Sequence, residues 1–197
     1  ANGMMPAGTA AYEKRGIAAD LPHWNIKNCM QCNWCASVCP HAVVRPFVMT
    51  AEEAEGVADA VPMKGAKDKK FTLGWSLMDC TGCGSCAEVC PARNKAITMA
   101  PAEDHFMHAA QAKYDHLYKN VDEKETPFKE STVKGAQLKT PLMEFSGACP
   151  GCGIPVNVNL LLRGIEGNVV LLFQTGCAMV VTTAYPKTSF KVPYVHN

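Results

Sequence analysis

Two stretches of the sequence repeat one cysteine pattern, CMQCNWCASVCP at residues 29–40 and CTGCGSCAEVCP at residues 80–91. In both stretches three cysteines at three-residue intervals are followed by a fourth cysteine and a proline, giving C-x2-C-x2-C-x3-C-P. Cysteines this close together on a loop or short helix converge on one centre, as a metal site requires. Because the unit occurs twice, it predicts a small domain with pseudo-twofold symmetry, and this prediction decides the expected fold.

The spacing is typical of bacterial two-cluster ferredoxins, in which three cysteines of a loop bind one [4Fe–4S] cluster and the fourth binds the other cluster. Pro40 and Pro91 fix the backbone where each ligating turn ends. Gly82 and Gly84 allow backbone amides to approach the cluster sulfurs. The expected ligand sets are Cys29, Cys32, Cys35 and Cys90 for the first cluster, and Cys80, Cys83, Cys86 and Cys39 for the second.

Zinc and disulfide bonds are the alternatives to this interpretation. Zinc sites usually combine one C-x2-C pair with a second pair further along the chain, which fits two triplets with trailing cysteines poorly. A disulfide framework is typical of shorter secreted chains, and the odd total of 11 cysteines argues against complete pairing within the chain. We therefore favour two iron–sulfur clusters. Trp34 and His41 lie in or beside the first motif and could tune or shield a cluster, although we expect them to serve packing.

The rest of the first 144 residues is expected to surround this pseudo-twofold core. Thr50 is a plausible N-cap with acidic residues after it, which predicts a surface helix over 50–61. The basic stretch 64–70 is expected to be a solvated loop, with a weaker possibility that it steers an acidic partner. Strands are predicted at 42–49 and 95–100, a helix within 103–127, and an extended connection over 122–142.

The C-terminal part has a different composition, with a Gly- and Pro-rich loop followed by apolar runs. FSGACPGCG at 145–153 contains Cys149 and Cys152, a helix is expected to open near Pro155, and the apolar run 168–174 is typical of a parallel strand buried on both faces. Cys177 follows that strand directly, where ligands bind in open α/β sheets. The spacing of these three cysteines alone fits two interpretations equally. Cys149, Cys152 and Cys177 bind a third cluster, or Cys177 is a small buried residue and Cys149 and Cys152 form a redox pair or half of a zinc site.

Charge and hydropathy exclude several classes of protein. The 19 basic and 18 acidic residues nearly balance, so there is no electrostatic case for a nucleic-acid partner. The longest apolar runs are far shorter than the roughly 20 residues that cross a bilayer, and no membrane association is expected. The N-terminal stretch lacks the basic and apolar regions of a signal peptide, which leads us to expect a cytoplasmic protein.

The order of these motifs resembles pyruvate:ferredoxin oxidoreductase. The resemblance rests on the two cysteine motifs, on TVKGAQLKTPLMEFSGACPGCG at 132–153 and on TGC at 175–177, and it extends over GTAAYEKRG at 8–16, LMDCTGCGSCAEVCP at 77–91 and NKAITM at 94–99. The stretch after Cys177 is more similar to the separate thiamine-binding subunit of the multi-subunit members. The resemblance does not identify the 2-oxoacid.

The resemblance implies an α+β fold, with a bacterial two-[4Fe–4S] ferredoxin-like domain followed by the first βα elements of an α/β thiamine-diphosphate-binding domain. The expected organisation is an N-terminal extended lead (1–27), the ferredoxin-like domain (28–102), a linker (103–144) and a partial thiamine diphosphate domain (145–197). It also implies that Cys149, Cys152 and Cys177 bind a third, proximal [4Fe–4S] cluster, whose fourth ligand lies in the thiamine domain outside this chain.

In that family, a 2-oxoacid and coenzyme A are converted to acyl-CoA and CO2 at thiamine diphosphate and Mg²⁺, and the clusters pass the electrons to ferredoxin or flavodoxin. The sequence contains no Gly-Asp pair of the kind that holds the Mg²⁺ diphosphate. We therefore expect a segment that works in an oligomer with further domains or subunits, in an organism from an oxygen-poor niche. The alternatives are a non-catalytic ferredoxin-type subunit of another redox complex and a zinc-binding interaction module.

Overall fold

The structure is a computed structural model that describes residues 6–165, 169–173, 176–182 and 187–196. Its strands are β1 Asp20–Trp24, β2 Val44–Met49, β3 Val61–Met63, β4 Ala66–Trp75, β5 Ile97–Pro101, β6 Leu171–Phe173 and β7 Tyr194–His196. Its α-helices are α1 Trp34–Val38, α2 Ser85–Glu88, α3 Asp104–Asn120, α4 Val133–Ala136, α5 Gly153–Gly164 and α6 Cys177–Val180. Three short 3-10 helices are η1 Thr9–Tyr12, η2 Ile26–Asn28 and η3 Leu77–Asp79.

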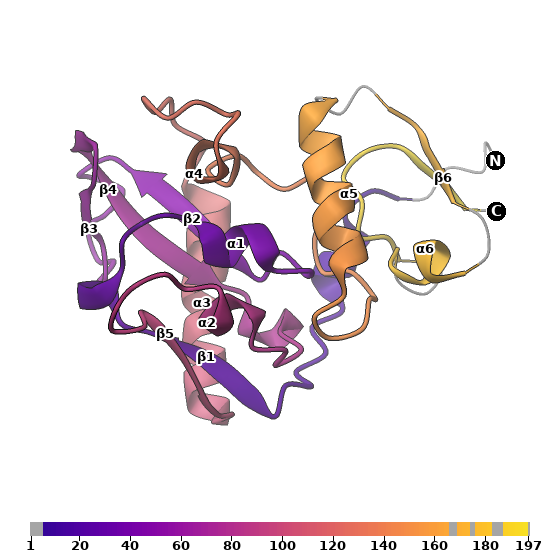
Figure 1. The fold of residues 1–197 in the computed structure, drawn as a ribbon, viewed down its shortest axis with the longest axis horizontal. Helices are drawn as coiled ribbons and strands as arrows, with labels where there is room; N and C mark the ends of the chain where they lie inside the picture. The colour runs from indigo at the N-terminus through magenta and orange to yellow at the C-terminus, as the bar shows by residue number, and fades with distance from the viewer. Residues whose placement is uncertain (1–5, 166–168, 174–175, 183–186, 197) are drawn as a thin grey trace.

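The N-terminal part is built from two antiparallel sheets with the short helices α1 and α2 beside them (Figure 1). One sheet pairs β1 with β5, and the other has the order β2-β4-β3. Each short helix starts inside one cysteine motif, and α1 packs against α2. The strands predicted at 42–49 and 95–100 are confirmed as β2 and β5, and the result is the mixed helix and strand content expected of a ferredoxin-type domain.

Helix α3 confirms the helix predicted within 103–127 and covers the N-terminal part from behind in Figure 1. Its buried Tyr114 and Leu117 join an apolar cluster with Phe47 from β2 and Phe145 from the segment before α5. This cluster links the connection between the two cysteine motifs to the C-terminal part. Within the connection over 122–142, α4 is the short helix, and the Thr132 side chain caps it by accepting from the Gly135 N–H at 3.1 Å.

The helix predicted over 50–61 is wrong, because the structure has a series of turns there. The expected cap is present: Thr50 Oγ1 accepts from the Glu53 N–H at 3.3 Å, and Glu53 Oε2 accepts from the Thr50 N–H at 2.9 Å. Gly56 then adopts φ +83°, which ends the helical course after about one turn. A cap can begin a helix but cannot propagate it without residues that bury an apolar face.

The loop predicted over 64–70 is also wrong in part, since β4 begins at Ala66 and its first residues form a hairpin with β3. The N-terminal lead is more structured than expected, because β1 occupies part of it and pairs with β5. Residues near the N-terminus also reach the C-terminal part, where the Gly8 N–H donates to the Phe190 carbonyl at 2.7 Å and the Ala10 N–H donates to the Thr188 carbonyl at 2.9 Å.

In the C-terminal part, α5 confirms the helix expected near Pro155, and β6 pairs with β7 in parallel. In Figure 1, α5 stands between the ferredoxin-type part and the elements β6 and α6. Burial of the strand on both faces is not observed: Leu171 packs against an apolar cluster that contains Leu162 of α5, whereas Val170 and Leu172 are 63% and 61% exposed. Paired strands meet at their edges, so a face of this two-stranded sheet is buried only where another layer packs on it.

None of the helices in the described ranges is both long enough and apolar enough to cross a bilayer.

Candidate functional site

The two cysteine loops have the same backbone course. The positions two and four residues after the first cysteine of each motif are left-handed: φ is +57° at Gln31 and +63° at Asn33, and +69° at Gly82 and +75° at Gly84. Glycine adopts this conformation without strain, and other residues do so at a cost. The glycines expected to shape the second loop therefore do so, while the first loop reaches the same shape with side chains in their place.

Side-chain hydrogen bonds hold those two residues of the first loop. Gln31 is 4% exposed; its Nε2 donates to the Pro62 carbonyl at 3.0 Å, and its Oε1 accepts from the Lys64 N–H at 2.7 Å. Asn33 donates through Nδ2 to the Lys134 carbonyl at 2.9 Å. These bonds compensate the left-handed strain and tie the first loop to the β3–β4 hairpin and to α4. Their partners are distant in the sequence, so sequence reasoning missed both residues.

Backbone amides point at cysteine sulfurs in both motifs. Such N–H···S contacts draw charge from sulfur and help to set the potential of an iron–sulfur cluster. The donor is two residues beyond the first cysteine in each loop, and beyond the fourth cysteine it comes from the segment that leads into the next strand. The four pairs are Gln31 N to Cys29 Sγ at 3.4 Å, Val43 N to Cys39 Sγ at 3.3 Å, Gly82 N to Cys80 Sγ at 3.4 Å, and Ala96 N to Cys90 Sγ at 3.4 Å.

One cavity is lined by four cysteines that come from both motifs. The loop of the first motif supplies three of them and the second motif supplies the fourth. The remaining wall is mainly apolar, with Trp24, Phe71, Leu73 and Ile97 among its residues. The cysteines are Cys29, Cys32, Cys35 and Cys90.

A second cavity is arranged like the first. Its wall includes Pro22, Val43 and Met99, together with His41. Its four cysteines are Cys39, Cys80, Cys83 and Cys86. The structure therefore brings together the same two groups of four that the sequence predicts, with Cys39 and Cys90 exchanged between the motifs. Within the described ranges, no three His, Cys, Asp or Glu side chains are close enough to hold a single metal ion.

Four thiols in these cavities, those of Cys35, Cys39, Cys80 and Cys86, have raised pKa values and favour the neutral form. Burial, followed by repulsion from neighbouring cysteines, raises the pKa of Cys86 to about 12, and burial also raises the pKa of Cys80 to about 12. Burial raises the pKa of Cys39 and raises that of Cys35 well above its ordinary value. Iron binds thiolates, so the positive charge of the metal has to stabilise them here. Four sulfurs around an apolar cavity fit an iron–sulfur cluster in donor type and in the surrounding wall.

His41 links the second cavity to the segment that precedes Cys149. It is 2% exposed, and its Nδ1 lies 3.0 Å from both the carbonyl and the Oγ of Ser146. Ser146 Oγ in turn donates to the Pro40 carbonyl at 3.1 Å, and the Phe145 N–H donates to the His41 carbonyl at 2.9 Å. Burial lowers the pKa of His41, so the neutral imidazole is favoured. His41 is therefore a buried part of the wall of the second cavity, while Trp34 is 45% exposed.

The three remaining cysteines lie outside both cavities. Cys149 and Cys177 are exposed, and Cys152 is half-buried at the N-cap of α5. The loop that carries Cys149 and the helix that starts at Cys177 rest on one apolar cluster, because Ala148 and Val181 both belong to it. The Gly147 N–H also donates to the Val181 carbonyl at 3.2 Å. Cys177 therefore follows β6 as expected, and its helix is tied to the Cys149 loop.

Gly151, between Cys149 and Cys152, lies against the second cysteine cavity. A Cβ atom at Gly151 would be 3.7 Å from the Cβ of Cys83 and 3.8 Å from the Oγ of Ser85. The loop with the third group of cysteines therefore meets the second cavity rather than the first. This adjacency could not be read from the sequence, because nothing in the linker indicates which motif the loop will approach.

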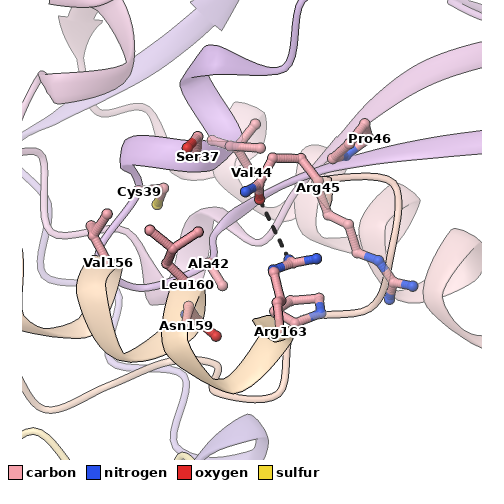
Figure 2. A pocket seen from close by; sticks show the side chains of 13 residues that line it. Ser37, Cys39, Ala42, Val44, Arg45, Pro46, Val156, Asn159, Leu160 and Arg163 are labelled. Carbon is pink, nitrogen blue, oxygen red and sulfur yellow. Dashed lines mark hydrogen bonds between the residues drawn. The ribbon is translucent and has the colours of Figure 1, made fainter. Parts of the chain in front are cut away.

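A third cavity separates α1 and β2 from α5 (Figure 2). It contains one cysteine, Cys39, whose sulfur faces the apolar side chains of Val156 and Leu160 in the view. At its other end Arg163 donates to the carbonyls of Ala136 and Lys139. These contacts fasten α5 to the linker, so we interpret this cavity as part of the joint between the two parts of the chain.

Comparisons with known proteins agree with this geometry. Residues 25–94 match the family model of a 4Fe-4S dicluster domain. The chain is 40% identical, over 97% of its length, to pyruvate:ferredoxin oxidoreductase of Moorella thermoacetica, and 39% identical, over 100%, to pyruvate-flavodoxin oxidoreductase of Klebsiella pneumoniae. It is 35% identical, over 99%, to pyruvate dehydrogenase [NADP(+)] of Cryptosporidium parvum. The chain spans 17%, 16% and 10% of these three relatives, respectively. The resemblance drawn from the sequence is confirmed.

Proposed function

We propose that this chain, which is similar over its length to one segment of pyruvate:ferredoxin and pyruvate-flavodoxin oxidoreductases, carries electrons within an enzyme that oxidatively decarboxylates a 2-oxoacid, with pyruvate as the expected substrate. The observation that carries the proposal is the pair of cavities, each lined by four cysteines with one cysteine exchanged between the motifs. That exchange is the ligand arrangement of two-cluster ferredoxins.

We assign one [4Fe–4S] cluster to each cavity. Each bound cluster would accept and release one electron at a time. The chain's own residues would surround each cluster with a partly apolar wall, hold Cys35 and Cys86 on α1 and α2, and donate backbone N–H groups to four of the sulfurs. The first cluster would be held by Cys29, Cys32, Cys35 and Cys90, and the second by Cys39, Cys80, Cys83 and Cys86.

A third cluster is assigned to Cys149, Cys152 and Cys177. The contact of Gly151 with Cys83 supports an order in which electrons pass from this third site to the second cavity and then to the first. The other eight cysteines line the two cavities, so a fourth ligand would come from elsewhere in the enzyme. Thiamine diphosphate, Mg²⁺ and coenzyme A belong in this proposal to the remaining domains or subunits, and ferredoxin or flavodoxin is the external acceptor.

Iron and acid-labile sulfide in the anaerobically prepared chain give the first test. About eight of each per chain are expected when both cavities are filled, and about twelve when the third site is also filled. A preparation reconstituted under anaerobic conditions that binds neither iron nor sulfide, or one that binds zinc instead, contradicts the proposal. A filled protein whose native complex does not depend on thiamine would favour a non-catalytic ferredoxin-type subunit of another redox complex.

Single ligand replacements test the exchange of cysteines. Cys90→Ala should remove or convert the cluster of the first loop, and Cys39→Ala that of the second loop, although each replaced residue belongs to the other motif. Pairing Cys90→Ala with Cys32→Ala is diagnostic, because both changes then damage one cluster and the double variant should lose no more iron than about one cluster's worth. Two results together would refute the assignment. The Cys32→Ala/Cys90→Ala variant would lose the electron paramagnetic resonance signals of both clusters, and the single variants Cys90→Ala and Cys86→Ala would damage the same cluster.

A further inference from the structure

The third cavity, between α1, β2 and α5, has two arginine side chains at the end opposite Cys39 (Figure 2). Arg45 comes from β2 and Arg163 from the last turn of α5, so the cavity brings together positive charge from both parts of the chain. Among the described residues that line it there is no aspartate or glutamate. Its volume of about 60 Å³ leaves room for several water-sized groups. A small polar ligand therefore fits here, and a large organic molecule does not.

Arg45 is a buried cation. It is 7% exposed, and its Nη2 donates to Thr140 Oγ1 at 2.7 Å. Its Cζ lies 4.8 Å from the centre of the Phe47 ring and 5.4 Å from that of the Tyr118 ring. Its buried Nε has no hydrogen-bond partner within the described ranges. A buried charge is costly unless an opposite charge and hydrogen bonds compensate it, so these contacts hold the guanidinium in place without neutralising it.

Arg163 adds a second guanidinium to the same cavity. It donates to the carbonyls of Ala136 and Lys139 and, at 3.4 Å, to Gln137 Oε1. Its buried Nε also lacks a hydrogen-bond partner in the part of the chain that the structure describes. Burial lowers the pKa of Arg163, and the charge of Arg45 acts in the same direction. The two cations are thus close enough to repel each other.

The carboxylates nearest in electrostatic effect are paired with other residues. Glu123 and Glu144 oppose the lowering of the Arg163 pKa, which shows that their charges reach it. Glu123 lies 3.8 Å from Lys139 Nζ, and Glu144 lies 2.7 Å from Lys191 Nζ. Across the described ranges, neither carboxylate is in ion-pair contact with either arginine. An additional anion in the cavity would supply the opposite charge at contact distance.

We propose that Arg45 and Arg163 together bind one phosphate group in the joint between the ferredoxin-type part and α5. The planar guanidinium matches the oxygens of phosphate and donates strong, charge-assisted hydrogen bonds to them. The bound anion would neutralise like charges from β2 and α5, and so tie α5 to the ferredoxin-type part. Because Cys152 is the N-cap of α5, the anion would also help to hold this cysteine in position. The site is independent of the proposed electron transfer, since the two arginines bind no cluster.

The test is equilibrium binding of radiolabelled inorganic phosphate to the full chain of 197 residues, prepared anaerobically and held at constant ionic strength. One phosphate per chain should bind with a dissociation constant of about 0.1–10 mM, as expected for two charge-assisted contacts. Arg45→Gln and Arg163→Gln should each weaken binding about tenfold or more. Arg93→Gln is the matched control, because it removes the same charge from an exposed arginine that does not line this cavity, and its affinity should stay within about twofold of the parent.

Two further measurements separate a phosphate site from a general effect of charge. Arg163→Lys keeps the positive charge and loses the planar fork, so it should bind phosphate more weakly than the parent and more tightly than Arg163→Gln. Phosphate should raise the anaerobic thermal midpoint of the parent and of Arg93→Gln, because it binds the folded state, and should not raise that of Arg45→Gln. Competition by glycerol 3-phosphate would identify the ligand as a phosphomonoester, and lack of competition would identify it as free phosphate.

Three results would overturn the proposal. The first is a parent chain without saturable phosphate binding, and the second is an equal loss of affinity in Arg93→Gln, because net charge would then be responsible. The third comes from the holoenzyme that contains this chain, where the parent should bind one phosphate more than Arg45→Gln does. Equal numbers there would mean that another segment of the enzyme neutralises the two arginines.

Discussion

Gln31 offers the sharpest test of how the first cysteine loop keeps its shape. Its left-handed backbone, at φ +57°, is held by two buried side-chain hydrogen bonds to the β3–β4 hairpin. Replacing it with alanine removes both bonds and keeps the backbone strain. At about 1 kcal/mol for each bond, Gln31→Ala should destabilise the closed loop by about 2 kcal/mol.

Gln31→Gly is the matched variant, because it removes the same bonds and gives the loop the residue type found at Gly82 in the second motif. Relief of the left-handed strain stabilises the closed loop by about 1–2 kcal/mol, and the larger conformational entropy of glycine in the open chain offsets about 0.5–1 kcal/mol of this stabilisation. The net destabilisation should therefore be about 1 kcal/mol. The glycine variant should be more stable than the alanine variant and less stable than the parent.

The assay is the anaerobic bleaching of cluster absorbance in the presence of an iron chelator. Each 1.36 kcal/mol corresponds to about tenfold in rate when loop opening precedes the loss of iron. Bleaching should be about thirtyfold faster in Gln31→Ala and about fivefold faster in Gln31→Gly. When only the two cavities are filled, the fast phase should carry about half of the amplitude, since this loop would bind one of the two proposed clusters. Equal rates in the two variants, or a fast phase that includes both clusters, would show that the hydrogen bonds do not shape this loop as argued.

Two further predictions concern the scaffold. A Cβ atom at Gly74 would lie 2.6 Å from Cε2 of the buried Phe47, so Gly74→Ala should destabilise the protein by about 1–3 kcal/mol and lower its anaerobic thermal midpoint. Gly153→Ala is the control, because a Cβ atom there has no neighbour within 4 Å and should not lower the midpoint. Equal midpoints for the two variants would contradict the packing argument. Burial would raise the pKa of Glu53, but hydrogen bonds from Lys124 and from the backbone lower it more, and the net direction is downward. The ionised Glu53 therefore stabilises the protein above its unfolded-state pKa of about 4.3, and this stabilisation is lost as pH falls through its folded-state pKa. The difference in thermal midpoint between the parent and Glu53→Gln should narrow from pH 6 to pH 4. A difference that widens over this range would contradict the assigned direction.

Much of the candidate site could be predicted because ligand spacing is a local property. The intervals within each motif determine which sulfurs share a loop, and the pattern is typical of one cluster chemistry. The strands after each motif could be predicted because they follow the repeated unit, and α5 could be predicted from Pro155 near its start. The turn region after Thr50 was predicted as a helix because its cap is a local signal, whereas propagation depends on burial that the sequence does not display.

The sequence by itself determined the number of cysteines, their grouping, the expected exchange of Cys39 and Cys90, and the resemblance on which the proposed enzymatic setting rests. Only the tertiary structure decided how the first loop holds a left-handed course without glycine, because Gln31 and Asn33 find their partners in distant segments. Only the tertiary structure decided that Gly151 lies beside Cys83, which places the third group of cysteines next to the second cavity. The physical reason is the same in both cases: ligand type and spacing are encoded over a few residues, whereas a contact between segments 30 or more positions apart depends on how the whole chain packs.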